Sequence, residues 1–144
     1  MWLITDRGFY SAVAHRTKPE TIIVRARDRR DLLRLDDLIP DGTPSAAERI
    51  WEDPRADYRY RMEVSRTEWA YACGQLAVGI DYPNFKDAVT RTLGRARHDV
   101  YMRVWSVLQN IAPRGKGGAY ASHAEPLGLP ARSRRGGGTG RMRA

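Results

Sequence analysis

Four arginines in two short segments, Arg25, Arg27, Arg59 and Arg61, have the spacing of a binding surface. Successive side chains of a β-strand point to opposite faces, so each pair of arginines lies on one face of its strand. If the two strands are neighbours, four guanidinium groups line one surface of a sheet. Guanidinium groups bind phosphate through paired hydrogen bonds and stack on bases. The pattern therefore predicts a surface for RNA or single-stranded DNA.

The same arginines also fit a second interpretation, a solvated sheet face without a ligand. Charged side chains normally occupy the wet face of an antiparallel sheet. In that case the guanidinium groups form ion pairs with the nearby carboxylates of Glu63, Asp28 and Asp57. The two interpretations place the arginines alike and differ only in what they bind.

A second set of arginines, Arg132, Arg134 and Arg135, lies among glycines near the end of the chain. From Arg114 onward there are seven basic residues and one acid, Glu125, so this stretch carries +6 of the total charge of +8. Arginine interspersed with glycine resembles the RGG-type segments that contact nucleic-acid backbones. The alternative is a solvated extension with no ligand. The preceding residues carry only +2, which is weak support for polyanion binding by a folded domain.

Residue types that could support catalysis are present but do not form a recognisable constellation. Ser11 and His15 share one face of a predicted strand, yet four strand residues separate them by about 13 Å, too far for a hydrogen bond. The sequence holds no phosphate-binding or dinucleotide-binding glycine motif. The spacing of Asp36, Asp37 and Asp41 is not that of a calcium loop. We therefore expect no enzyme activity, no cofactor and no metal site.

The apolar pattern predicts a sheet with a hairpin at its start. Asp6, Arg7 and Gly8 form the expected turn, with Gly8 free to adopt a positive φ. β-branched and alternating segments predict strands over residues 2–5, 9–15, 21–27, 48–52 and 57–64. The alternation also places Tyr58 and Tyr60 toward the core.

Capping residues and helical spacing predict four helices between and after these strands. Asp28 or Asp31 caps the first helix, which ends near Leu38. Ser65 and Glu68 form a capping box for the second, and Asn84 caps the third. Gly94 separates the third helix from a fourth over residues 95–112. The apolar positions that we expect to be buried are Trp69, Cys73, Leu76, Ala77 and Ile80 in the second helix, and Val100, Val104, Leu108 and Ile111 in the fourth.

The order of elements predicts an α+β fold, an antiparallel sheet of four to five strands with helices packed on one face. Residues 21–81 follow the order βαββα, so a ferredoxin-like arrangement is the first expectation. The apolar stripes stop near Ala112, which predicts a compact domain over 1–112 and a basic, flexible, glycine- and arginine-rich tail over 113–144. The tryptophans, Trp2, Trp51, Trp69 and Trp105, are expected in the core or at its edge.

Two stretches of the chain resemble an uncharacterised family of short proteins from actinobacteria and their phages. They are Trp2-Leu3-Ile4-Thr5-Asp6-Arg7-Gly8-Phe9-Tyr10-Ser11 and Ile80-Asp81-Tyr82-Pro83-Asn84-Phe85-Lys86. The resemblance covers most of residues 1–112 and excludes the basic tail. It implies a compact domain of bacterial or phage origin, and it carries no activity or site residue to this chain.

These observations together favour a small, non-enzymatic binding or regulatory protein that acts through a protein partner. The alternative is nucleic-acid binding through the arginine-lined sheet face and the basic tail. One cysteine, Cys73, excludes an intramolecular disulfide and fits a reducing compartment, so we expect a cytoplasmic protein, in the host cytoplasm if phage-encoded. No apolar run reaches the length of a membrane span, and the first residues do not resemble a signal peptide.

Overall fold

The computed structural model describes residues 1–40 and 46–111, of which Met1–Gln109 form one unit. The predicted tail over 113–144, with Arg132, Arg134 and Arg135, lies outside the described residues.

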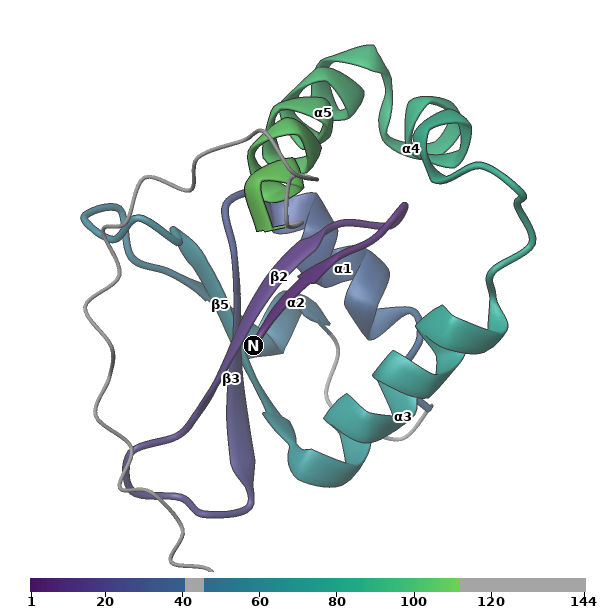
Figure 1. The fold of residues 1–144 in the computed structure, drawn as a ribbon. Helices are drawn as coiled ribbons and strands as arrows, with labels where there is room; N and C mark the ends of the chain where they lie inside the picture. Colours follow the sequence, from purple (N-terminus) through teal and green to yellow (C-terminus); the bar gives the residue numbers. More distant parts are fainter. Residues whose placement is uncertain (41–45, 112–144) are drawn as a thin grey trace, which may run out of the picture. The chain divides into compact units, whose positions relative to one another are not determined.

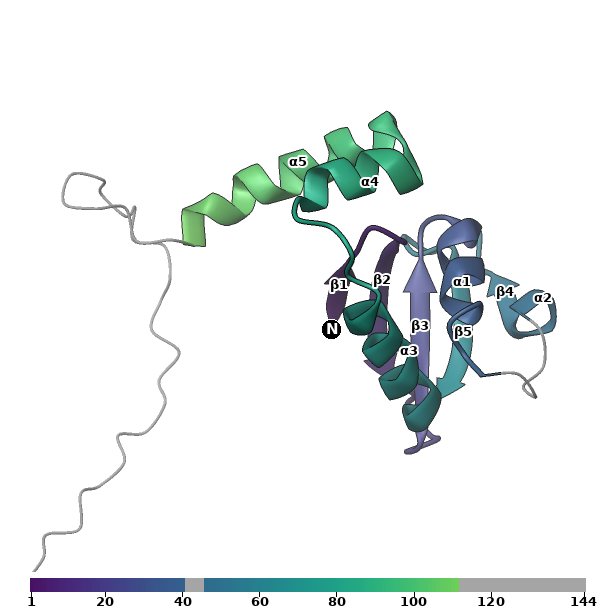
Figure 2. The same cartoon turned by 90° about the vertical axis from the view of Figure 1, so that its right-hand side faces the viewer.

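A five-stranded antiparallel sheet with strand order β1-β2-β3-β5-β4 forms the framework (Figure 1). Helices α1 and α3 both contact β3 and β5 and lie on one face of the sheet (Figure 2), and neither covers the other face. The predicted α+β class and antiparallel sheet are confirmed. The strands are β1 (Trp2–Ile4), β2 (Phe9–Ala14), β3 (Thr21–Ala26), β4 (Ile50–Glu52) and β5 (Tyr60–Ser65).

The helices begin at the predicted caps. Asp28 accepts a hydrogen bond from the Arg30 amide, Ser65 and Glu68 form a reciprocal capping box, and Asn84 accepts from the Lys86 amide. A short helix, α2, was not predicted. The helices are α1 (Arg29–Asp36), α2 (Ala46–Arg49), α3 (Arg66–Val78), α4 (Phe85–Leu93) and α5 (Arg95–Leu108), followed by a 3₁₀ turn over Gln109–Ile111.

The ferredoxin-like expectation agrees with the segment from β3 to α3. Its strands lie in the order β3-β5-β4, as in the first three strands of a βαββαβ unit. The position on the other side of β3 is filled by β2, which precedes β3 in the chain, rather than by a strand after α3. The N-terminal hairpin thus takes the place of the last strand of that arrangement.

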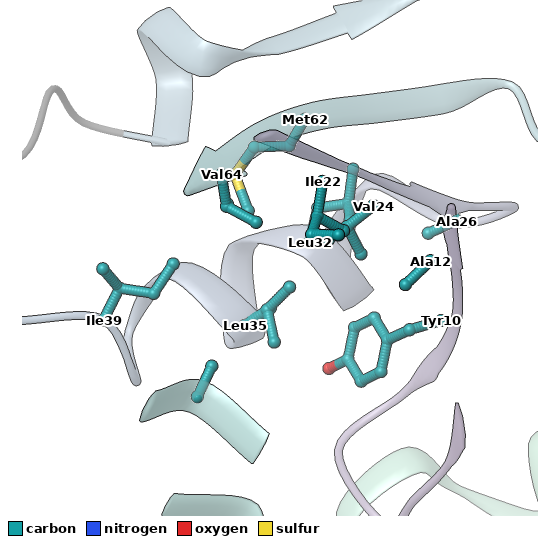
Figure 3. Close-up of a cluster of buried hydrophobic side chains, with 11 residues drawn as sticks. Tyr10, Ala12, Ile22, Val24, Ala26, Leu32, Leu35, Ile39, Met62 and Val64 are labelled. Carbon is teal, nitrogen blue, oxygen red and sulfur yellow. The ribbon is translucent and has the colours of Figure 1, made fainter. Parts of the chain in front are cut away.

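The core lies between the sheet and α1. Ile22, Val24 and Ala26 alternate inward along β3 and face Leu32 and Leu35 of α1 (Figure 3). Both leucines are fully buried. This apolar layer fixes which face of the sheet is covered, and with it the face that stays open.

Gly8 is required for packing rather than for backbone conformation. Gly94 is the one described residue with a positive φ, 85°, so the turn does not use the freedom of Gly8 to adopt a positive φ. A Cβ at Gly8 would lie 2.8 Å from the Tyr10 hydroxyl and 2.9 Å from the Asp31 Cβ. Real Cβ atoms essentially never come so close, so a side chain here would displace the start of β2 or α1.

Several apolar side chains are more exposed than their spacing predicts. In α3 the fully buried residue is Ala72, while Ala77 is exposed. Ile80, predicted as a buried residue of this helix, lies beyond its end and is exposed. Along α5, Val100 and Leu108 are about half exposed, at 52% and 49%. Trp2, Trp51 and Trp105 are 70%, 40% and 50% exposed, so the prediction that they belong to the core or its edge is wrong for these three.

Candidate functional site

A row of side chains crosses the open face of the sheet in register. The strand pairing places Trp2 opposite Ser11, Ser11 opposite Arg25, Arg25 opposite Arg61, and Arg61 opposite Trp51. Directly opposed residues of antiparallel strands share a face, so these five side chains form one line, which we call the transverse row. At about 4.8 Å per strand the row spans about 19 Å. It has an exposed indole at each end and two half-buried guanidinium groups toward its centre, and Ser11, between Trp2 and Arg25, is buried.

Arg25 is the central cation of the row. Its Nη2 donates a hydrogen bond of 2.7 Å to Ser11 Oγ, and its guanidinium carbon lies 4.9 Å from the centre of the Tyr58 ring. Its Nε is buried and has no hydrogen-bond partner among the described residues. No described carboxylate lies within 4.0 Å of Arg25. The fold therefore holds a positive charge on this face without neutralising it.

The other predicted arginines each have a carboxylate nearby. Arg61 lies 3.8 Å from Asp53, Arg27 lies 4.0 Å from Asp57, and Arg59 pairs with Glu52. The contacts of Arg61 and Arg27 are at the outer limit for an ion pair, so both guanidinium groups keep donors for a further anion.

The solvated-face interpretation expected the sheet arginines to pair with Glu63, Asp28 and Asp57, and one of these three carboxylates does so. Asp57 pairs with Arg27, but Glu63 is bound by Lys18 at 2.7 Å and by His15 at 3.3 Å. The hydrogen bond from Lys18 lowers the pKa of Glu63, so this carboxylate is ionised and already paired. Asp28 pairs with Arg30 and Arg97 instead of an arginine of the sheet.

An aromatic cavity of about 280 Å³ adjoins the Trp2 end of the transverse row. Arg27 contributes to its lining, together with aliphatic side chains of β1 and α5. The ring of Trp2 meets that of Phe9 edge-on, with centroids 5.7 Å apart, and Phe9 lies 6.1 Å from Tyr58. Tyr58 is buried, as predicted, but it packs against Phe9 and the arginines outside the main core cluster, whereas Tyr60 packs against that cluster. The four rings of the cavity are Trp2, Phe9, Tyr58 and Tyr101.

A buried ion pair places α5 at this cavity. Asp31 of α1 is 1% exposed and accepts hydrogen bonds from the Phe9 amide at 3.1 Å and from Arg97 Nη1 of α5 at 2.7 Å. Burial disfavours the charge of Arg97, but the hydrogen bond to Asp31, the charge of Asp31 and the interaction with Tyr101 together outweigh it and raise the pKa of Arg97. Burial, reinforced by the Asp31 charge, also raises the pKa of Tyr10, whose hydroxyl stays protonated. Asp31 thus joins β2, α1 and α5.

The candidate nucleophiles are engaged elsewhere. Ser11 Oγ is held by Arg25, and His15 faces Glu63 rather than Ser11. Burial raises the pKa of the Cys73 thiol, which disfavours the reactive thiolate. Within residues 1–40 and 46–111, no cluster of three or more His, Cys, Asp or Glu side chains has the geometry of a metal site. None of the described helices combines the length and apolar character needed to cross a bilayer.

Comparisons with protein-family models, with curated proteins and with solved structures found no match to this chain. The site therefore has to be interpreted from its own geometry.

The sequence identified the arginines of this face but missed its tryptophans. Trp2 and Trp51 belong to edge strands of three residues each, too short to show which face an indole occupies. The alternation along β3 places Arg25 on the other face of the strand from Ile22 and Val24. Assigning the tryptophans to the face of Arg25 requires, in addition, the register of the neighbouring strands. That register depends on long-range pairing and is not contained in any one segment.

Proposed function

We propose that this protein binds single-stranded nucleic acid, without catalysing a reaction on it, and that the transverse row supplies the contacts. The observation that carries the proposal is the direct opposition of Arg25 and Arg61 on an open sheet face. Like charges placed opposite each other destabilise a sheet. An anion bound between the two guanidinium groups removes this repulsion, and a phosphate group fits their paired donors.

The exposed indoles favour a single strand over a duplex. Base–aromatic stacking needs bases that are not already stacked within a helix. Trp2 and Trp51 flank the two arginines at opposite ends of the row. A strand that crosses the sheet can stack bases on both indoles while its phosphates lie on Arg25 and Arg61. The arginines of the tail, Arg132, Arg134 and Arg135, would add charge that attracts the same backbone.

The proposal is tested by fluorescence anisotropy with a labelled single-stranded oligonucleotide of about twelve nucleotides. In the full chain, Arg25→Ser with Arg61→Ser should weaken binding about tenfold or more, because two charge-assisted phosphate contacts are lost. The matched control is Arg91→Ser with Arg95→Ser, which removes the same charge from exposed positions on α4 and α5. Equal affinity for the two double variants would reject the role of the row.

A protein partner remains the second candidate, favoured by the apolar surface of α5. A cavity of about 410 Å³ is lined by Phe85, Trp105 and Leu108 among others, and the last two are about half exposed. Exposed apolar patches of this kind mark many protein interfaces. A partner that stays bound at high salt and after nuclease treatment, and is lost on Leu108→Glu, would favour this candidate. Either function fits the cytoplasmic location that the single free thiol suggests.

A further inference from the structure

We infer that the aromatic cavity is a nucleobase pocket, which takes one unstacked base of the strand bound along the transverse row. The inference rests on the proposed function and names the part of the ligand that a specific site recognises. It starts from the position of Trp2, which belongs both to the transverse row and to the lining of the cavity. A strand held by Arg25 and Arg61 therefore passes directly beside the cavity.

The shape and lining of the cavity suit a flat aromatic ring. Its volume of about 280 Å³ exceeds that of a nucleobase and leaves room for part of a sugar. Trp2 is 70% exposed, so its ring is accessible from solution. Phe9 stands edge-on to Trp2, at an interplanar angle of 87°, and forms a wall beside that ring. A base can thus stack on one ring and contact the edge of the other.

The charges around the cavity favour a base that belongs to a nucleotide. Aromatic cages also accommodate cations such as methylated lysine. Here the guanidinium groups of Arg25 and Arg27 both lie about 5 Å from the Tyr58 ring, at 4.9 and 5.0 Å. They repel a cationic ligand and attract a phosphate. A base with an attached phosphate can stack on the aromatic rings and pair with the arginines at the same time.

Tyr58 has a positioning role in this arrangement. It is 5% exposed and contacts Phe9 as well as both guanidinium groups. Its ring therefore holds the arginines at the border of the cavity, while Trp2 and Phe9 offer the surfaces for the base. The placement of α5 by Arg97 and Asp31 brings Tyr101 to the remaining side.

The experiment compares the full chain on two labelled oligonucleotides with the same backbone, one with bases and one abasic. The wild type should bind the base-containing strand more tightly, by about tenfold for each base stacked on Trp2 or Trp51. Trp2→Ala should reduce this preference about tenfold and leave the affinity for the abasic strand unchanged. The control is Trp105→Ala, which removes a half-exposed indole that does not line the cavity and should keep the preference.

The outcomes separate this inference from the proposed function. If Trp2→Ala and Trp105→Ala behave alike, the base pocket is rejected while backbone binding stands. If the wild type binds both strands equally, stacking on Trp51 is rejected as well, and only phosphate binding by the arginines stands. If neither strand binds, the proposed function fails, and the pocket with it. Circular dichroism of Trp2→Ala checks that the fold is intact, which the exposure of this residue leads us to expect.

Discussion

Replacing Arg97 with methionine should lower the free energy of unfolding by about 3–5 kcal/mol, the usual cost of breaking a buried ion pair from one side. The variant leaves the carboxylate of Asp31 at 1% exposure, with Arg34 at 3.4 Å as its nearest other cation in α1. Urea denaturation at neutral pH measures the change. Because folded domains are stable by only about 5–15 kcal/mol, the loss should be evident in the midpoint.

The control for this prediction lies on the same helix. Arg103 of α5 is exposed, so Arg103→Met should change stability by about 0.5 kcal/mol or less. If Arg97→Met were no more destabilising than Arg103→Met, the ion pair would not hold α5 in place. The aromatic cavity would then lose its physical basis, since Tyr101 reaches the cavity from that helix.

Leu35→Ala should be among the most destabilising substitutions in the apolar core, at about 3–5 kcal/mol. Leu35 is fully buried between α1 and the sheet, so its removal leaves a cavity that neighbouring strands cannot readily close (Figure 3). Leu33→Ala makes the same chemical change two residues earlier, at a half-buried position outside that cluster.

Denaturation of both leucine variants gives a comparison in which side-chain chemistry is constant. We expect Leu33→Ala to cost less than half as much as Leu35→Ala. A larger effect at Leu33 would mean that α1 presents a different face to the sheet, and the assignment of the open face would be reversed.

The parts of the fold that follow from local chemistry could be predicted from the sequence. The alternation of Ile22, Val24 and Ala26 identifies a strand because the side-chain period is local. Ser65 and Glu68 are three residues apart and satisfy each other's backbone groups, so the capping box is also visible in the sequence. α2 was missed because four residues hold too few apolar positions to show a helical period.

The parts that could not be predicted depend on contacts between distant residues. The ion pair that places α5 joins Asp31 to Arg97, 66 residues apart, and no local pattern predicts that these two residues pair. The exposure of Trp2, Trp51 and Trp105 was missed for a related reason. Apolar spacing identifies a face of an element, but whether another element covers that face is decided by the whole fold.

The most direct test of the central claim is the salt dependence of oligonucleotide binding by the full chain. Two triple variants that each remove three positive charges are compared. The sheet variant carries Arg25→Ser, Arg27→Ser and Arg61→Ser. The tail variant carries Arg132→Ser, Arg134→Ser and Arg135→Ser. Each lost phosphate contact reduces the slope of log K against log salt by about 0.7 for a single strand. The sheet variant should therefore lose about 2 from the slope and bind more weakly than the tail variant at every salt concentration. The claim that the sheet arginines bind the phosphates would be contradicted by two results together: the sheet variant keeps the wild-type slope and affinity, and the tail variant no longer binds.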